Sequence, residues 1–308
     1  MRLKLRRLKT TPRPATRFRE AEQRIEALQN RPIPSPLNPV SQTIFLSHGV
    51  RTQRAVLLLH GYTNSPHQFR QLGQRFFEQG CNVLIPRMPH HGLAQRRNNA
   101  LGKLTGEELV QYATEVCDIA IGLGEELTVM GLSAGGVLTG WLAAQRDDID
   151  TAVLISPALG ATGQSIRGIA LLTRFALAMP NFNIWWGKRG DMSGESHTYP
   201  RWATRGLAHI FRVGIVVQRT ARRCPPLAKQ LALVINENDA AISHPAEERL
   251  ARDYERNGVG LKRYVFPKSA DLDHDVIDPT HEKANIELVY PVLLELGLAE
   301  VHCQRDND

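Results

Sequence analysis

One stretch constrains this chain more than any other: Val129-Met130-Gly131-Leu132-Ser133-Ala134-Gly135-Gly136. An apolar run before the serine predicts a buried strand, and the small residues after it predict a helix. A serine at such a sharp turn takes a strained backbone conformation. Side chains two residues before and after it, at Gly131 and Gly135, would collide. This spacing is typical of a nucleophile elbow, which presents a serine hydroxyl at a helix N-terminus. A tight turn with an incidental serine fits the same residues, so the rest of the chain must decide.

The segments around this turn alternate between predicted strands and predicted helices. Strands are expected at 43–46, 55–59, 81–86, 127–132, 151–155, 231–235 and 261–266, and helices at 66–79, 105–121, 134–145, 245–257 and 279–296. The internal strands are apolar throughout, which indicates burial on both faces. The predicted fold class is therefore α/β, with a mostly parallel central sheet and helices on both faces.

Between about residues 160 and 230 the alternation stops. The segment has a helical and irregular pattern and many large apolar residues: Phe175, Met179, Phe182, Trp185, Trp186, Trp202 and Phe211. We interpret it as a helical cap, or lid, inserted late in the sheet, although a longer piece of the body would give the same pattern. The core would then comprise residues 41–159 and 231–308, preceded by an arm of residues 1–40.

The formal net charge of +7 is concentrated in that arm. Residues 1–31 hold ten basic and three acidic residues, while the remainder holds 28 of each. The basic pI therefore does not indicate that the fold binds nucleic acid. We expect a poorly ordered, solvated tail at 1–14, an amphipathic helix at 16–29 packed on the body, and a proline-rich extended linker at 31–39. A weak contact of residues 1–31 with a membrane surface is the alternative to a mere tail.

Cysteine usage and hydropathy bear on the compartment. Cys81, Cys117, Cys224 and Cys303 have neither C-x-x-C nor metal-ligand spacing, which favours free thiols in a reducing cytosol. The first residues lack the continuous apolar region of a secretory signal. No stretch approaches the roughly 18 uncharged residues that span a bilayer. A cytoplasmic protein is expected, and the sequence leaves its oligomeric state open.

A serine nucleophile needs a base to take its proton and a carboxylate to orient that base. In the chain order serine, acid, histidine, both helpers follow later strands. The strand at 231–235 leads into Asp239, the expected acid, with Glu237 in the same turn as the alternative. The strand at 261–266 leads toward His274, the expected base. His281 is the rival base, but we expect it in the first turn of the last helix.

Two backbone N–H groups are expected to stabilise the oxyanion of the intermediate, at about 2.7–4 kcal/mol each. One belongs to Ala134, directly after the serine. The other belongs to Tyr62, because Gly61 lets that turn approach the substrate. We expect His60 to hold the same turn through a hydrogen bond.

The neighbouring His90 and His91 resemble a metal-binding pair only superficially. Adjacent side chains point apart in most backbones, and no carboxylate or cysteine lies near them in the sequence. We therefore predict no metal site and no cofactor.

Four motifs, taken in order, carry a resemblance to a known family. They are His60-Gly61-Tyr62, Gly131-Leu132-Ser133-Ala134-Gly135-Gly136, Asn238-Asp239 and Asp273-His274. Together they resemble serine hydrolases of the α/β-hydrolase fold, most nearly bacterial carboxylesterases and monoacylglycerol-lipase-like enzymes, over roughly residues 41–298. The resemblance implies Ser133 as nucleophile, Asp239 as acid, His274 as base, and the amides of Tyr62 and Ala134 as oxyanion donors. It also implies a helical cap where residues 160–230 lie. It says nothing about the N-terminal arm or the identity of the substrate.

The expected function is hydrolysis of carboxylic esters through an acyl-enzyme. The aromatic composition of the cap favours an apolar acyl chain or another lipid-like ester over a charged substrate. A thioesterase or another acyl hydrolase of the same fold would use the same residues. A non-catalytic binding protein of this fold is a further alternative, although no triad position is lost.

Overall fold

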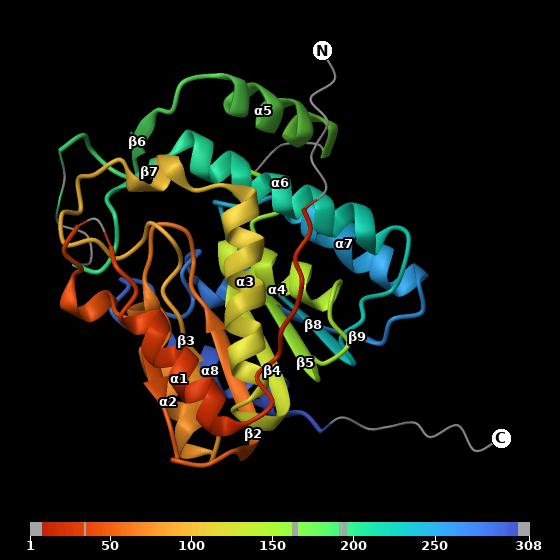
Figure 1. Ribbon diagram of the computed structural model, residues 1–308. Coiled ribbons are helices and arrows are strands. Elements are labelled where there is room, and N and C mark those ends of the chain that lie inside the picture. The colour runs from red at the N-terminus through yellow and green to blue at the C-terminus, as the bar shows by residue number, and fades with distance from the viewer. Residues whose placement is uncertain (1–7, 34, 162–165, 191, 193–195, 301–308) are drawn as a thin grey trace.

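The computed structural model describes residues 8–33, 35–161, 166–190, 192 and 196–300. A seven-stranded sheet forms its centre, in the order β1-β3-β2-β4-β5-β8-β9 (Figure 1). The strands are β1 (Ile44–Leu46), β2 (Thr52–Leu59), β3 (Asn82–Ile85), β4 (Gly124–Leu132), β5 (Thr151–Ile155), β8 (Gln230–Asn236) and β9 (Leu261–Phe266). The edge strand β1 runs antiparallel to β3, and the other neighbours pair in parallel. The predicted α/β class with a mostly parallel sheet is confirmed.

Helices cover both faces of this sheet. They are α2 (Arg70–Glu78), α3 (Gly106–Ile121), α4 (Ala134–Ala143), α7 (His244–Arg256) and α8 (Ile286–Leu298), and α1 (Phe18–Gln29) packs on the outside of α3. Along β2, Leu57 and Leu59 belong to the core cluster under α3, α4 and α7, whereas Val56 and Leu58 belong to the cluster under α2 and α8. Successive strand residues point to opposite faces, and both faces here are covered. This explains why the buried part of β2, residues 55–59, is apolar at every position.

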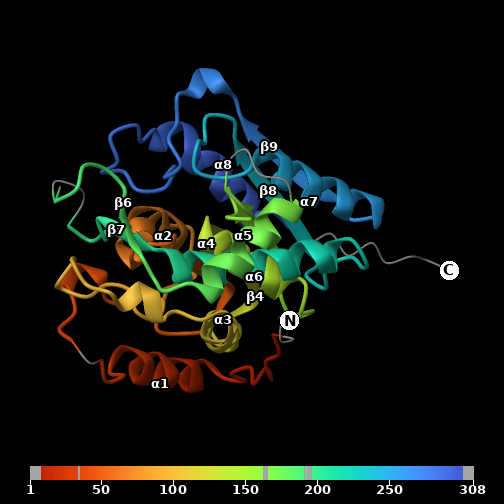
Figure 2. The same cartoon turned by 90° about the horizontal axis from the view of Figure 1, so that it is seen from above.

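The N-terminal segment is part of the packed body. Helix α1 buries Ala21, Ile25 and Leu28 and lies against α3 (Figure 2). Before it, the backbone N–H of Arg13 donates to the Asp118 carboxylate at 2.7 Å, and the hydroxyls of Thr10 and Thr114 are joined by a hydrogen bond.

The expectation of a poorly ordered tail is therefore wrong for residues 8–14, because hydrogen bonds to α3 fix their path, although residues 11–14 are exposed to solvent as expected. Residues 1–7 lie outside the described part of the chain.

Two predicted helix starts differ from the structure. The last helix begins at Ile286, where the side chain of Asn285 accepts a hydrogen bond from the Leu288 N–H. Residues 279–285 form turns instead, because the Asp278 carboxylate binds the N–H and hydroxyl of Thr280. His281 therefore lies in a turn and not in the helix. The helix predicted from residue 66 opens as a short 3₁₀ turn, Pro66–Phe69, before α2.

The segment between β5 and β8 contains α5 (Ile166–Ala178), β6 (Asn183–Trp185), β7 (Arg201–Ala203) and α6 (Thr204–Ala221). It is not wholly helical, since β6 and β7 form an antiparallel hairpin. Seen from above, α5 and α6 cross the end of the sheet near α4 (Figure 2). We call residues 160–230 the cap segment.

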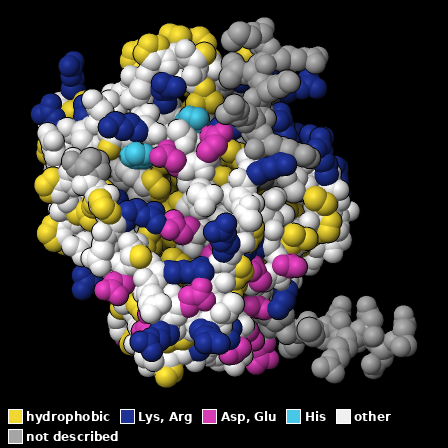
Figure 3. All heavy atoms as spheres, in the orientation of Figure 1, with side chains coloured by type: hydrophobic (Ala, Val, Ile, Leu, Met, Phe, Trp, Pro, Cys, Tyr) yellow, Lys and Arg dark blue, Asp and Glu magenta, His cyan; other side chains and the backbone are white. Residues whose placement is uncertain are grey.

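Several large apolar side chains of the cap segment face solvent. Phe175 is 62% exposed, Phe182 56% and Trp186 58%. Figure 3 shows hydrophobic side chains gathered at the top of the molecule, where α5 lies in Figure 1. The expectation of an apolar substrate rests on the aromatic composition of this segment. Because these three side chains face solvent, they do not support that expectation.

Among the described cysteines, Cys81, Cys117 and Cys224 are free thiols, and Cys303 lies outside the described residues. None of the described helices combines the length and the apolar composition needed to cross a bilayer.

The packing of α1 predicts that the arm stabilises the body. Ile25 is 2% exposed, so Ile25→Ala is expected to lower the free energy of unfolding by about 2–5 kcal/mol, through lost apolar burial and a cavity. Urea unfolding followed by circular dichroism measures this. Gln23→Ala, on the exposed face of the same helix, is the control and should change it by less than about 0.5 kcal/mol. Equal stabilities of the two variants would contradict the packing of α1.

Candidate active site

Ser133 joins β4 to α4 in a backbone conformation that side chains rarely adopt, with φ +57° and ψ −110°. A Cβ added at Gly135 would lie 1.9 Å from the Leu59 carbonyl oxygen, and one added at Gly131 would lie 2.4 Å from the Gly135 carbonyl carbon. Both contacts are with backbone atoms, which cannot move aside without shifting the sheet. The predicted steric reason for glycine at these two positions is confirmed.

Hydrogen bonds from β5 and the turn after it hold the strained serine in place. The Ser133 N–H donates to the Ile155 carbonyl at 2.9 Å. The Ser133 carbonyl accepts from the N–H groups of Val137 and Ala158, both at 3.0 Å. A non-glycine residue keeps a positive φ only where the surrounding hydrogen bonds and packing hold its backbone in that conformation. The elbow therefore depends on its neighbours in the sheet as well as on its own glycines.

The turn after β2 lies directly beside the serine. A Cβ at Gly61 would be 3.8 Å from the Ser133 Cβ. Within the described residues, neither the Tyr62 N–H nor the Ala134 N–H donates a hydrogen bond. Two backbone donors thus remain available in the two turns that flank Ser133. The Tyr62 hydroxyl donates to the Ala203 carbonyl at 3.0 Å, which ties this turn to the cap segment.

His60 holds the same turn, as expected. It is fully buried, and its Nε2 accepts a hydrogen bond from the Met88 N–H at 3.1 Å. Nδ1 therefore carries the proton and donates to the Gly61 carbonyl at 2.9 Å. Burial lowers the pKa of His60 to about 4, so the ring is neutral at physiological pH.

The structure brings Asp239 and His274 together. Asp239 follows β8 and His274 follows β9, the next strand in the sheet, and Asp239 Oδ2 lies 2.5 Å from His274 Nδ1. Asp239 Oδ1 accepts the Ala241 N–H at 2.8 Å. The alternative acid, Glu237, instead accepts the Lys268 N–H at 3.1 Å. The alternative base, His281, has its Nδ1 buried without a hydrogen-bond partner and is not paired with Asp239.

Each member of this pair shifts the pKa of the other. Burial lowers the pKa of His274, but the hydrogen bond and charge of Asp239 outweigh it, so the imidazole pKa is raised overall. Burial raises the pKa of Asp239, but the hydrogen bond and charge of His274 outweigh it, and the carboxyl pKa is lowered. The carboxylate is fully buried, whereas 30% of the His274 side chain is exposed. The pair therefore combines an ionised acid with an accessible imidazole.

Three polar residues that the sequence analysis did not single out hold the loops of the site together. The Asn236 side chain, at the end of β8, donates to the carbonyls of Leu272 and Asp273, at 3.2 and 2.8 Å. The Gln68 side chain accepts the Gly61 N–H at 2.8 Å and donates to the Asp275 carboxylate at 2.6 Å. This chain of contacts joins the turn beside Ser133 to the loop of His274.

The hydroxyl of Ser133 has no hydrogen-bond partner among the described residues. In enzymes without a bound substrate, catalytic hydrogen bonds are often long and tighten only when substrate binds. The arrangement therefore supplies a strained serine, two available N–H donors and an ionised Asp–His pair along one edge of the sheet.

Hydrogen bonds join the cap segment to the turn after β2 and to the loop that follows His274. His197 Nε2 and Asp278 Oδ2 lie 2.6 Å apart, with both side chains almost wholly buried. Burial raises the pKa of Asp278, but the hydrogen bonds from His197 and Thr280 together outweigh it, so the carboxyl pKa is lowered. On the other side, the N–H of Tyr199 donates to the Thr63 carbonyl at 2.8 Å. The cap segment thus contacts the turn that contains Tyr62 and the loop that follows His274.

His90 and His91 have separate partners. His90 Nε2 lies 3.3 Å from the Glu108 carboxylate, and His91 Nδ1 lies 2.8 Å from the Pro89 carbonyl. In the described ranges, no cluster of three or more His, Cys, Asp and Glu side chains is arranged to hold a metal ion.

Comparison with known proteins gives one family match. The sequence model of the alpha/beta hydrolase family matches residues 56–282, a range that includes both Ser133 and His274. A thermostable monoacylglycerol lipase from Bacillus sp. (strain H-257) is 32% identical over 110 residues. That match spans 34% of this chain and 40% of the relative's length.

Solved structures share the fold across most of both chains. A soluble variant of monoglyceride lipase from Saccharomyces cerevisiae superposes with a TM-score of 0.63 at 13% identity, covering 86% of this chain and 96% of that one. The monoacylglycerol lipase of Paleococcus ferrophilus gives 0.60 at 18% identity, covering 82% and 96%. At these identities the likeness is one of fold.

The elbow geometry predicts that Gly135→Ala lowers the free energy of unfolding by about 3 kcal/mol or abolishes folding, because the new Cβ meets backbone atoms. Gly260→Ala is the matched control, since a Cβ there meets nothing within 4 Å. Chemical denaturation of both variants measures the difference. A stable, fully folded Gly135→Ala would contradict the close approach of the elbow to β2.

Proposed function

Because this chain belongs to the alpha/beta hydrolase family, we propose that it is a serine hydrolase that cleaves carboxylic esters. The observation that carries the proposal is the Asp239–His274 hydrogen bond at the ends of β8 and β9, at the same sheet edge as a strained serine at the end of β4. A buried carboxylate that holds one imidazole nitrogen leaves the other available to accept a proton. A serine in this position is a nucleophile in need of such a base.

The proposed reaction proceeds through an acyl-enzyme. The Ser133 Oγ attacks the ester carbonyl carbon while His274 Nε2 takes the hydroxyl proton. The N–H groups of Tyr62 and Ala134 stabilise the negative charge on the carbonyl oxygen. His274 then gives the proton to the departing alcohol, and water releases the acid by the same steps in reverse order.

The proposed substrate class is a monoester with a lipid-like acyl chain. The relatives compared above are monoacylglycerol and monoglyceride lipases, which supports this class. The exposed aromatic residues of the cap segment do not support it. We further propose that residues 160–230 act as a lid, supported by the contacts of Tyr199 and His197 with the two loops beside the site. Thioesters present the same electrophilic carbonyl and are cleaved by the same groups.

A labelling experiment tests the nucleophile. A fluorophosphonate probe is expected to modify the wild-type protein at Ser133, since only an activated serine reacts. Ser133→Ala should lose both the label and at least about 10⁴-fold of the hydrolysis of p-nitrophenyl esters and monoacylglycerols. Ser269→Ala, an exposed serine on the same loop as His274, is the control and should keep both. Undiminished labelling or turnover in Ser133→Ala would exclude this mechanism.

The pH profile tests the acid and the base. Only neutral His274 accepts a proton, so kcat/KM should rise with pH through the raised imidazole pKa, above the ordinary value of 6.5. In Asp239→Asn the charge of Asp239 and its charge-assisted hydrogen bond, the two largest interactions that raise the His274 pKa, are lost while burial remains, so the acidic limb should move to lower pH. The rate should also fall on the order of 10³–10⁴-fold.

Glu237→Gln is the matched control for this experiment. It removes one carboxylate from the same turn, but the new side chain can still accept the Lys268 N–H. Its profile should overlay that of the wild type. A shifted limb in Glu237→Gln together with an unshifted one in Asp239→Asn would assign the acid to Glu237.

A further inference from the structure

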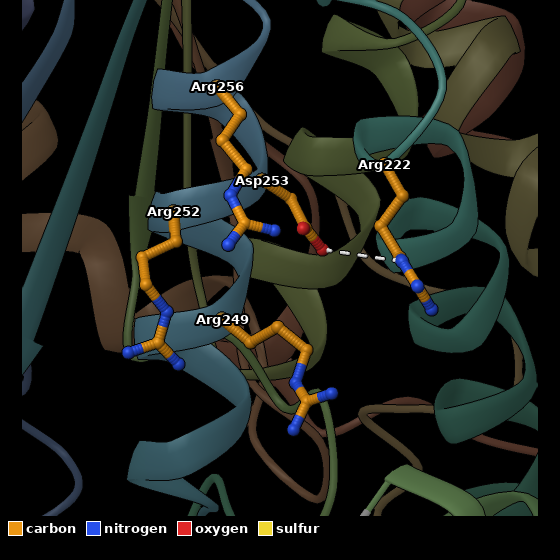
Figure 4. Close-up of a pocket in the computed structure, with 5 residues that line it drawn as sticks. All are labelled: Arg222, Arg249, Arg252, Asp253 and Arg256. Carbon is orange, nitrogen blue, oxygen red and sulfur yellow. Dashed lines mark ion pairs between the residues drawn. The ribbon is translucent and has the colours of Figure 1, made fainter.

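A cleft of about 330 Å³ lies between the C-terminal end of α6 and residues 249–256 of α7. Its lining residues are Arg222, Arg249, Arg252, Asp253 and Arg256. Figure 4 shows the last four projecting from successive turns of α7, with Arg222 facing them from the end of α6. Four guanidinium groups thus surround a space that contains one carboxylate. We call it the arginine cleft.

The positive charge of the arginine cleft is largely uncompensated. Arg249, Arg252 and Arg256 stand at positions i, i+3 and i+7, on one face of the helix, where like charges destabilise it. None of the three has an ion-pair partner in the described part of the chain. The buried Asp253 carboxylate lies 4.0 Å from the Arg222 Nε, and its Oδ2 makes no hydrogen bond. An anion in the cleft would relieve this repulsion.

Helix dipoles explain only part of the cluster. Arg222 and Arg256 lie at the C-terminal ends of α6 and α7, where cations interact favourably with the exposed carbonyl groups. Arg252 and Arg249 lie about one and two turns before the end of α7, outside the range of that effect. These two arginines therefore need another explanation, and they are the residues to change in a test.

We propose that the arginine cleft binds a multivalent phosphate-type anion. Guanidinium groups bind phosphate oxygens in pairs through a planar fork of N–H donors. The lining contains no aromatic or aliphatic residue on which a base or an acyl chain could pack, so recognition rests on charge. The phosphate belongs either to a free diphosphate-bearing molecule or to the headgroup of an anionic lipid.

The charge around the cleft favours the same class of ligand. Around Arg222 in the sequence, residues 219–229 hold four basic residues and no acidic one. A surface with one dominant sign of charge raises the local concentration of counter-ions and speeds their association. Anion binding in the arginine cleft does not depend on the ester chemistry at Ser133. Either proposal can therefore fail without the other.

Binding of inorganic pyrophosphate tests the free-ligand source. Isothermal titration of the full chain at low ionic strength is expected to give one pyrophosphate per chain, with affinity falling as NaCl is added. Arg249→Gln/Arg252→Gln should weaken binding at least tenfold. The control Arg51→Gln/Arg75→Gln removes the same two charges far from the cleft and should bind as the wild type does. Circular dichroism, unchanged in all variants, establishes that the chains are folded.

Sedimentation with vesicles tests the lipid source. Vesicles of phosphatidylcholine with 20% phosphatidic acid are compared with pure phosphatidylcholine, using the same three proteins. In either assay, loss of binding in the cleft variant with the control variant unaffected supports the proposal. The assay in which this loss is seen identifies the source of the phosphate. Absence of binding in both assays, or binding that the cleft variant retains, overturns it.

Discussion

The left-handed backbone at Ser133 is the constraint on which the rest of the site depends. It exists because no side chain is present at Gly131 or Gly135, and because the Ser133 peptide groups bond to β5 and the turn behind it. The approach of Gly135 to the Leu59 carbonyl also sets how closely α4 can lie to β2. The strain is therefore stored in the assembled sheet and not in the serine turn alone.

Hydrogen bonds from polar side chains connect the loops of the site to one another. Asn236 ties the loop of Asp239 to the loop of His274, and Gln68 ties the turn of Gly61 to Asp275. The buried His197–Asp278 pair adds the cap segment to the same framework. Removing one partner of a buried pair leaves the other unsatisfied, which costs more than the contact contributes. The site is thus held by mutual ties between loops that are distant in the sequence.

The sequence predicts well what depends on local pattern. Continuous apolar runs predict strands such as β2 because both faces of the sheet are covered, and the helix expected at 105–121 is found as α3, whose start is fixed by a capping box of Thr105 and Glu108. It cannot predict that Gln68 meets Asp275, since that contact joins residues 207 positions apart. Composition likewise does not tell which way Phe175 and Phe182 point. Helix α8 begins at Ile286, later than the expected residue 279, because the Asp278 carboxylate binds Thr280 and holds it in a turn.

The position of α1 has a consequence for the newly made chain. Its apolar stripe of Ala21, Ile25 and Leu28 is covered by α3, a helix that begins at Gly106. At synthesis rates of about 5–20 residues per second, the stripe emerges several seconds before its partner exists. During that interval it is an uncovered amphipathic segment of the nascent polypeptide. Exposed apolar surface of this kind is what chaperones cover while a chain is incomplete.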